Sequence, residues 1–480
     1  MNTINRIIKN ISITGISQVI LSLLGFLFLI YIARYLGEAE FGVYNLAISL
    51  TSIFVIFSDI GISQLIVREI ARNKKLSSNY LTNASFLKVI LSLITFVLIV
   101  LTSNLLGYPA DVNFIIYLFG IYTILSSFSQ MFIAFFQAFE KMEYVALLQL
   151  LEKLLLLSLG FVVLLLNLGL LFLSYIYVIV GIFDIVIGIY FVLHKITNKR
   201  AKLDYEIMKN LISTSVPFGL NALFGMLFFR IDTVILSILI NDVAVGIYSA
   251  AYNPLLTLSM IISGMVSTSI YPVMSRYFLH SKDYLEKFAL ISSKYLAIIG
   301  FPIAVLCFVF ADKILILFYA GQYINSIIVF QILSVFIPLR LISSITGTLL
   351  TSIDKQGMRT FSVGTAALLN TVLNLALIPS LSYVGAAITT IISELFLYLI
   401  ILYFIRKYYS EIQINSIYFK PCFSSLIMGL FLFYFRDMNI FVISIFASLI
   451  YFALLFLLNT FNDEDKYLFK EILKSIKVIK

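Results

Sequence analysis

The chain has 480 residues, of which 61% are hydrophobic and only 12% are charged. Such a composition excludes a soluble globular domain of this length. The formal net charge of +9 does not indicate a nucleic-acid surface, because no basic stripe interleaved with aromatic residues lies on a soluble segment. The excess charge lies in the loops between apolar segments, where we expect contact with lipid headgroups.

Fourteen apolar runs fill the chain from end to end, and most reach the roughly 20 residues that a helix needs to cross a bilayer. The run at 421–435 is short unless Arg436 extends to the interface. The spans are placed at 11–32, 43–66, 84–106, 113–139, 144–166, 170–193, 211–236, 247–270, 289–310, 326–350, 359–378, 386–405, 421–435 and 440–459. Because helices satisfy their backbone polar groups without water, the sequence predicts an all-α polytopic membrane protein.

The Lys and Arg residues fall almost entirely on alternate loops. One side of the membrane holds only Arg34, Lys313 and Arg436, whereas the other holds both termini and the remaining loop cations. Cytoplasmic loops carry the excess of Lys and Arg in membrane proteins. We therefore expect a multi-pass cell-membrane protein with both termini in the cytoplasm. An even number of helices agrees with this, because it places both termini on the same side.

Short motifs recur in order along the two halves of the chain, at offsets of 204, 214 and 210 residues. The matched pairs are Gly42-Val43-Tyr44 with Gly246-Ile247-Tyr248, Glu140-Lys141 with Asp354-Lys355, and Asp184 with Glu394. Chance matches in a Leu/Ile-rich sequence are the alternative. The similar offsets favour two copies of a six-helix unit, related by an axis along the membrane normal because six is even.

The repeat predicts the organisation of the chain. Residues 1–193 would form an N-terminal six-helix bundle and 211–405 a second one, joined by a cytoplasmic linker at 194–210. Residues 406–459 would add two further helices, and 460–480 would form a basic cytoplasmic tail. Two bundles of this kind suit a transporter that rocks around a central site.

Several motifs of the chain resemble those of a known family. They are Ala33-Arg34-Tyr35-Leu36-Gly37, Phe41-Gly42-Val43-Tyr44, Phe57-Ser58-Asp59-Ile60-Gly61-Ile62-Ser63-Gln64, Arg68-Glu69, Arg230-Ile231-Asp232-Thr233, Gly246 to Tyr252 and Tyr383 to Glu394. From about residue 5 to about residue 410, the chain resembles the polysaccharide biosynthesis (Wzx-type) flippases of the multidrug/oligosaccharidyl-lipid/polysaccharide exporter superfamily. The resemblance implies two six-helix bundles in a V, often with two extra helices, and alternating access without ATP. It also implies a lipid-linked saccharide, moved from the cytoplasmic to the outer leaflet for cell-surface polysaccharide or glycan assembly.

A charged side chain within a membrane span costs free energy, so each such cation is a candidate member of a transport pathway. Lys88 and Lys294 lie near the cytoplasmic ends of their helices, where we expect snorkelling. Lys153 lies mid-helix, Arg230 toward the external end, and Arg340 in the cytoplasmic half, after a kink expected at Pro338. Lys153, Arg230 and Arg340 are therefore candidate contacts for the phosphates of a polyprenyl-linked cargo.

The alternative for these cations is structural ion pairing, with Arg230 in an external gate. Asp59, Asp184, Asp232 and Glu394 are the acidic residues within the spans. They are candidates for coupling or gating, because a buried carboxylate can bind H⁺ or Na⁺ in an ion-coupled exporter. Plain pairing with the cations is their alternative role, and for Asp59 a structural cap beside Gly61.

The sequence contains no Walker loop, no Cys/His metal-ligand spacing, no serine elbow and no large extramembrane loop. We therefore expect no enzyme, no cofactor and no metal site. The alternatives within the superfamily are a multidrug/toxin antiporter and a peptidoglycan-precursor flippase, and from another class a membrane glycan polymerase or ligase. The expected partners are the lipid-linked saccharide and membrane lipids, with other glycan-assembly membrane proteins as further candidates and no nucleic acid.

Overall fold

The computed structural model describes residues 3–196, 201–280, 282–409, 415–461 and 465, and this part of the chain contains helices and no strands. The helices up to the middle of the chain are α1 (Thr3–Phe54), α2 (Ile56–Asp59), α3 (Ile62–Arg72), a 3₁₀ turn (Lys74–Leu76), α4 (Ser77–Leu105), α5 (Ala110–Ala138), α6 (Met142–Leu165) and α7 (Gly169–Lys195). They are followed by α8 (Tyr205–Leu239), α9 (Asp242–His280), α10 (Lys282–Val309), α11 (Ala311–Tyr319), α12 (Ser326–Ser334), α13 (Phe336–Ser352), α14 (Gln356–Tyr408), α15 (Asn415–Tyr434) and α16 (Ile440–Leu457).

Twelve helical segments of the described chain are long and apolar enough to cross a membrane. Two of them are kinked and each holds two of the expected spans. The first runs from Ser17 to Asp59 and departs from helical geometry at Gly37, and the second is α14, which does so at Ser382. The prediction of an all-α polytopic fold is confirmed, and each of the fourteen expected spans coincides with helix.

Two expected spans are broken rather than continuous, and a loop expected outside the membrane contains a helix. The segment 43–66 is interrupted at Val55 and again at Ile60 and Gly61, whose φ angles of 47° and 85° are left-handed. The segment 326–350 is interrupted at Val335, just before Pro338, which cannot donate a backbone hydrogen bond. The connection 311–325 contains α11.

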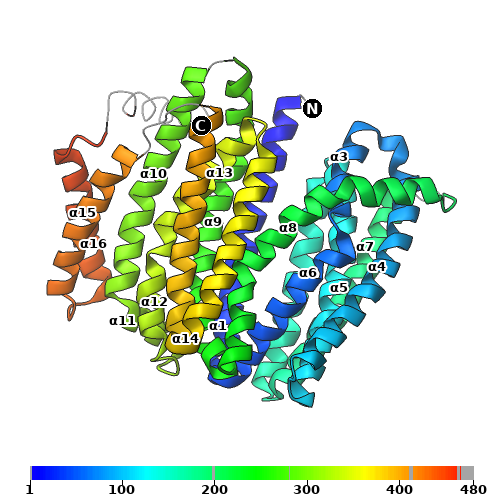
Figure 1. Ribbon diagram of the computed structural model, residues 1–480, viewed down its shortest axis with the longest axis horizontal. Helices are drawn as coiled ribbons and strands as arrows, with labels where there is room; N and C mark the ends of the chain where they lie inside the picture. The colour runs from blue at the N-terminus through cyan, green and yellow to red at the C-terminus, as the bar shows by residue number, and fades with distance from the viewer. Residues whose placement is uncertain (1–2, 197–200, 281, 410–414, 462–464, 466–480) are drawn as a thin grey trace. The chain divides into compact units, whose positions relative to one another are not determined.

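The chain divides into two compact units that do not follow the expected halves. The first unit comprises residues 1–257, 316–329 and 360–393, and the second comprises 258–315, 330–359 and 394–480. Within the first unit, α4, α5, α6 and α7 run side by side (Figure 1). The residue boundaries of the two bundles, the linker and the tail were derived from the internal repeat, and they remain predictions.

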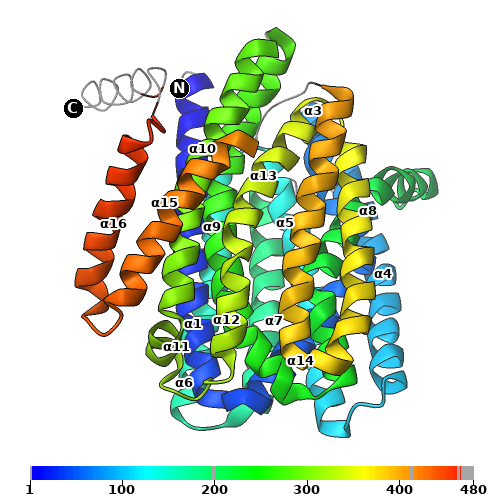
Figure 2. The ribbon, with the colours of Figure 1, turned by 60° about the vertical axis from the view of Figure 1, so that its left-hand side comes forward.

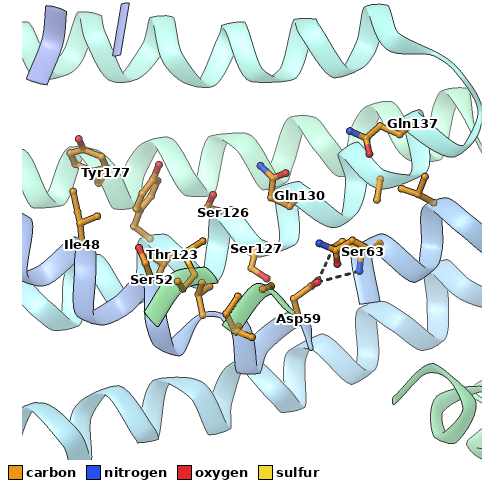
Figure 3. A pocket seen from close by; sticks show the side chains of 18 residues that line it. Ile48, Ser52, Asp59, Ser63, Thr123, Ser126, Ser127, Gln130, Gln137 and Tyr177 are labelled. Atoms are coloured by element: carbon orange, nitrogen blue, oxygen red, sulfur yellow. Dashed lines mark hydrogen bonds between the residues drawn. The ribbon is translucent and has the colours of Figure 1, made fainter. Parts of the chain in front are cut away.

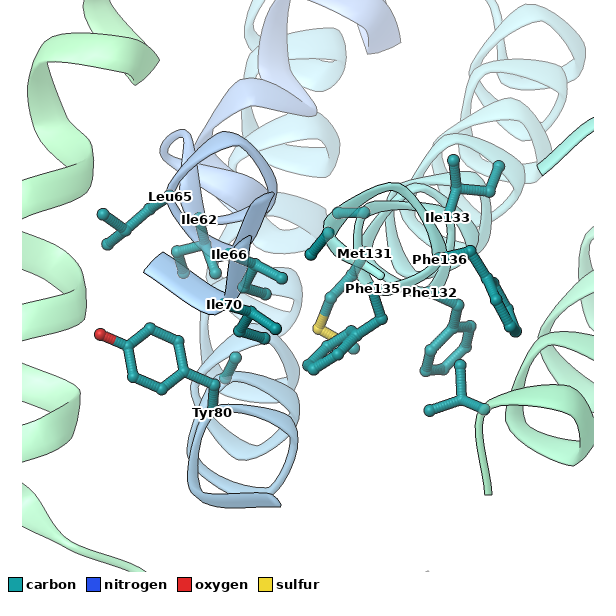
Figure 4. Close-up of a cluster of buried hydrophobic side chains, with 14 of the residues drawn as sticks. Ile62, Leu65, Ile66, Ile70, Tyr80, Met131, Phe132, Ile133, Phe135 and Phe136 are labelled. Atoms are coloured by element: carbon teal, nitrogen blue, oxygen red, sulfur yellow. The ribbon is translucent and has the colours of Figure 1, made fainter. Parts of the chain in front are cut away.

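An apolar cluster in the first unit fixes α3 against α4 and α5 (Figure 4). Ile62, Ile66 and Ile70 recur on one face of α3 and are buried, since residues three to four apart share a helix face. They meet Phe132 and Phe135 of α5 within the same cluster. This packing holds the start of α3, just after the break at Ile60 and Gly61, against α4 and α5.

In the second unit, α15 and α16 form a hairpin beside α10 (Figure 2). Arg436, between α15 and α16, pairs with Asp312 of α11 at 2.7 Å, and Asp465, which follows the hairpin in the chain, pairs with Lys294 of α10 at 2.5 Å. Lys294 is 8% exposed, so the expectation that it snorkels is wrong. Its ammonium group is instead neutralised inside the protein by a carboxylate that lies far along the chain.

Within the first unit, α1 and the start of α9 approach each other so closely that no side chain fits at two glycines. A Cβ on Gly42 would overlap the carbonyl oxygen of Asp242, and a Cβ on Gly246 would overlap that of Glu38. Both pairs of matching residues, Glu38 with Asp242 and Gly42 with Gly246, are 204 residues apart. Reciprocal contacts of this kind are what a twofold axis produces, and they agree with the expected repeat.

Substitution of either glycine by valine should destabilise this crossing, because the obstructing atoms belong to the backbone and cannot rotate away. Overpacking typically costs about 1–3 kcal/mol, and Gly42→Val and Gly246→Val should lie at the upper end of that range. Gly225→Ala on α8 is the control, since nothing lies within 4 Å of its added Cβ. Thermal unfolding in detergent measures the effect, and equal stability of the three variants would contradict the close approach.

Candidate functional site

A cavity of about 560 Å³, lined by both apolar and polar side chains, lies within the first unit, between the segment α1–α3 on one side and α5 on the other. Figure 3 shows Tyr177 at one end of the labelled side chains and Gln137 at the other, with Asp59 and Ser63 across from α5. Short stretches of α7 and α8 complete the wall, through Tyr177, Ala222 and Met226. The cavity is large enough for a small-molecule ligand.

One face of α5 supplies five of the polar side chains that line the cavity. They are Thr123, Ser126, Ser127, Gln130 and Gln137. Their spacing of three, four and seven residues places them on a single helix face. In a helix that crosses a membrane, such a polar face points away from lipid, and here it points into the cavity.

A buried ion pair closes the wall of the cavity at the break in the second span. Lys88 Nζ lies 2.6 Å from Asp59 Oδ1 and also donates to the carbonyl and hydroxyl oxygens of Ser127, at 2.9 and 2.8 Å. These contacts use all three donors of the ammonium group. Because Lys88 is fully buried, the expectation that it snorkels is also wrong.

Asp59 has a second role at the same place, which agrees with the structural cap considered for it. Its carboxylate accepts hydrogen bonds from the hydroxyl and the backbone N–H of Ser63, at 2.6 and 3.2 Å. These bonds hold the start of α3 after the left-handed residues Ile60 and Gly61. Gly61 cannot carry a side chain, because its Cβ would lie 2.7 Å from the backbone nitrogen of Gly219 on α8.

Three tyrosines form a cluster at the other end of the cavity. The hydroxyl groups of Tyr44 and Tyr177 lie 2.6 Å apart, and the rings of Tyr122 and Tyr177 meet edge-on with their centroids 4.9 Å apart. Tyr122 donates a hydrogen bond of 3.1 Å to Glu152 on α6. The cluster therefore joins α1, α5, α6 and α7 through polar contacts inside the membrane-spanning region.

Lys153 and Arg230 lie close to this cluster, and their contacts differ from those of the buried lysines Lys88 and Lys294. Lys153 directs its Nζ toward Gly25 of α1, 2.9 Å from where a Cβ would stand, and Arg230 interacts electrostatically with Tyr44. Both are partly buried. Among the residues that the structure describes, neither has a carboxylate in ion-pairing contact, whereas Lys88 and Lys294 each do.

The acidic candidates Asp184 and Asp232 are buried and bonded by hydroxyl groups. Asp184 accepts a hydrogen bond from Ser129 of α5. Asp232 accepts hydrogen bonds from Tyr248 and from the backbone N–H of Thr233, the latter at 2.7 Å. Plain pairing with a cation was the alternative role for Asp232. In the described part of the chain it has no ion-pair contact, although Arg230 interacts with it electrostatically.

Arg340 and Glu394 lie in the second unit and contact each other. Arg340 Nη1 is 3.6 Å from Glu394 Oε1, and Glu394 also accepts a hydrogen bond from Ser343. Glu394 is fully buried. Arg340 therefore has an ion-pair contact, whereas in the described part of the chain Lys153 and Arg230 interact with Glu152 and Asp232 only electrostatically.

The sequence interpretation missed the α5 face and the tyrosine cluster. The polar spacing along α5 was a usable signal, because Thr123, Ser126, Gln130 and Gln137 stand out in an otherwise apolar helix. The cluster gave no signal of that kind, since Tyr44, Tyr122 and Tyr177 come from three distant helices.

A sequence profile of the family described as "Polysaccharide biosynthesis protein" matches residues 7–278, more than half of the chain. The chain is 25% identical over 374 residues to the "Probable low-salt glycan biosynthesis flippase Agl15" of Haloferax volcanii, a match that covers 77% of each protein.

Two solved structures are similar in fold. The first is the lipid II flippase MurJ in an inward closed conformation, with a TM-score of 0.73 and 12% identity, covering 93% of this chain and 98% of MurJ. The second is an inward-facing multidrug resistance MATE transporter of the MOP superfamily, with a TM-score of 0.66 and 16% identity, covering 84% and 98% of the two chains. At these identities the likeness concerns the fold. The profile match extends over more than half of the sequence, and the chain belongs to the polysaccharide biosynthesis protein family.

Proposed function

We propose that this protein is a flippase that moves a polyprenyl-phosphate- or diphosphate-linked oligosaccharide from the cytoplasmic to the outer leaflet by alternating access. The transport would serve cell-surface polysaccharide or glycan assembly. Family membership and the relative named as a probable glycan biosynthesis flippase support the class of function. The observation that carries the proposal is that Lys153 and Arg230 have no ion-pairing carboxylate among the described residues.

An incompletely neutralised charge inside a membrane protein is costly. In the described part of the chain, Lys153 and Arg230 interact electrostatically with Glu152 and Asp232 but form no ion-pair contact with them, which favours a ligand of opposite charge. A phosphate or diphosphate headgroup provides that charge. Arg230 can engage phosphate oxygens with two parallel N–H donors, while Lys153 acts as a point charge. A cationic drug would be repelled by both residues, which disfavours a multidrug antiporter.

Arg340 can join these contacts only if phosphate competes with Glu394 for its guanidinium group. We therefore assign the phosphate contacts to Lys153 and Arg230 first and to Arg340 as an exchange site. Coupling to H⁺ or Na⁺ falls on Asp184 and Asp232, since Asp59 and Glu394 already contact cations. The protein would act without a catalytic reaction, as its transporter relatives do.

The proposed direction of transport requires both termini in the cytoplasm. Reporter fusions after residues 75, 200 and 410 should therefore read cytoplasmic, and fusions after 37, 244 and 382 should read external. Residues 200 and 410 lie outside the described part of the chain. An external reading at 200 would contradict the orientation and the assignment of 194–210 as the linker between repeats.

Depletion of the protein in its own cells tests the function. The lipid-linked saccharide should accumulate in the cytoplasmic leaflet, and re-expression of the wild-type chain should restore its appearance outside. Total saccharide synthesis should stay intact, because synthesis precedes the step proposed here. Loss of synthesis itself would indicate a glycan polymerase or ligase instead.

A further inference from the structure

We infer that the cavity beside α5 binds the uncharged sugar portion of the cargo and not its phosphate. The inference rests on the proposed function, because it divides one cargo between two places in the first unit. The phosphate would contact Lys153 and Arg230, and the saccharide would occupy the cavity that ends at Gln137. This assignment of sugar and phosphate to separate places follows from the polar groups of the cavity wall that have no partner within the described part of the protein and can bind a ligand.

The cavity offers no available charge. Among the described residues that line it, only Asp59 carries a charge, and the ammonium group of Lys88 neutralises that carboxylate at 2.6 Å. Lys88 is itself fully buried, and its three donors are used by Asp59 and Ser127. A phosphate would therefore find no free cation there, and a cationic drug would find no uncompensated carboxylate.

The cavity does offer three amide side chains from its two walls. Gln64 comes from α3, and Gln130 and Gln137 come from α5. Within the described chain none of the three has a hydrogen-bonding partner, and Gln64 and Gln130 are exposed to the cavity side. Each amide provides two donors and an acceptor oxygen. Sugar hydroxyls both donate and accept, so they match such a set, whereas a phosphate only accepts.

The aromatic end of the cavity fits the same ligand. The hydroxyl groups of Tyr122 and Tyr177 are already bonded, to Glu152 and Tyr44 respectively. What Tyr122 still offers a ligand is part of its apolar ring, since a tyrosine combines an apolar body with a polar tip, whereas Tyr177 is only 5% exposed. A sugar ring carries C–H groups on its faces that can pack against such rings.

Photocrosslinking in cells tests the inference for whichever glycan the cells attach to the lipid. Benzoylphenylalanine is placed at Gln64 or at Gln130, on opposite walls, and at Leu93 as a control. Leu93 lies on α4, is 65% exposed and does not line the cavity. The adducts are isolated, digested and analysed for sugar by periodate oxidation and mass spectrometry. Sugar-bearing adducts are expected at Gln64 and Gln130, and sugar-free phospholipid adducts at Leu93.

A second measurement tests the inference even if a variant that carries the crosslinker fails to fold. The double variant Gln130→Leu/Gln137→Leu keeps the side-chain size but removes both amides, and it should slow translocation about tenfold or more at unchanged protein abundance. Wild-type translocation by this variant, or sugar-free adducts at both cavity positions in cells that still translocate, would overturn the inference alone. Absence of translocation by the wild-type protein would overturn the proposed function as well.

Discussion

Asp59→Asn should remove far more folded protein from the membrane than Lys88→Met. The asparagine leaves the ammonium group of Lys88 charged and fully buried without its counter-ion. Loss of one partner from a buried ion pair typically costs about 3–5 kcal/mol. The methionine instead leaves Asp59, whose side chain is 20% exposed and still accepts two hydrogen bonds from Ser63, so its cost should be smaller.

The double variant Asp59→Asn/Lys88→Met provides the control for this asymmetry. It removes both charges, and replacement of a complete buried ion pair is often close to neutral. Folded abundance, measured by size-exclusion chromatography of detergent extracts, should recover most of what Asp59→Asn loses. An additive loss in the double variant would contradict a direct pairing of the two side chains.

Arg230→Ala and Lys153→Ala should slow translocation of the lipid-linked saccharide by about tenfold to a hundredfold, because a charge-assisted hydrogen bond contributes about 1.5–3 kcal/mol. Neither substitution removes an ion-pair contact in the described part of the chain, because Glu152 and Asp232 interact with these cations only at longer range, so folded abundance should stay near the wild-type level. Leaflet-resolved detection of the saccharide, normalised to folded protein, measures the effect.

Two further variants separate a phosphate contact from a structural role. Arg230→Lys should rescue only part of the activity, because an ammonium group keeps the charge but loses the planar fork of donors. Lys294→Met is the matched control. It leaves the buried carboxylate of Asp465 without its ion-pair partner, so it should lower the abundance of folded protein together with transport. A loss of protein in Arg230→Ala equal to that in Lys294→Met would contradict the assignment of Arg230 to the cargo.

The sequence predicted the helical segments well, because their length and hydropathy are local properties of the chain. Breaks within the segments were harder to foresee. Pro338 indicated a kink near Val335. The interruption at Ile60 and Gly61 depends instead on packing of α3 against α5 and of Gly61 against α8. Contacts of that kind leave no periodic signal in the sequence.

The roles of the interior cations could be predicted only in part. Depth along a helix suggested snorkelling for Lys88 and Lys294, but each meets a carboxylate from another segment, at Asp59 and at Asp465. Such partners become visible only once the helices are packed. The same limit applied to Tyr44 and Tyr177, whose hydroxyl groups meet across 133 residues of sequence.

The most direct test of the account is transport by the purified protein. The protein is reconstituted into liposomes that contain lipid-linked saccharide extracted from its own cells, and enzymatic access to the sugar is followed from the outside over time. We predict that the wild-type chain exposes the inner-leaflet saccharide without ATP and leaves it chemically unchanged, while the Arg230→Ala variant does so at least about tenfold more slowly. Equal exposure in protein-free liposomes, or chemical alteration of the saccharide by the protein, would contradict the account.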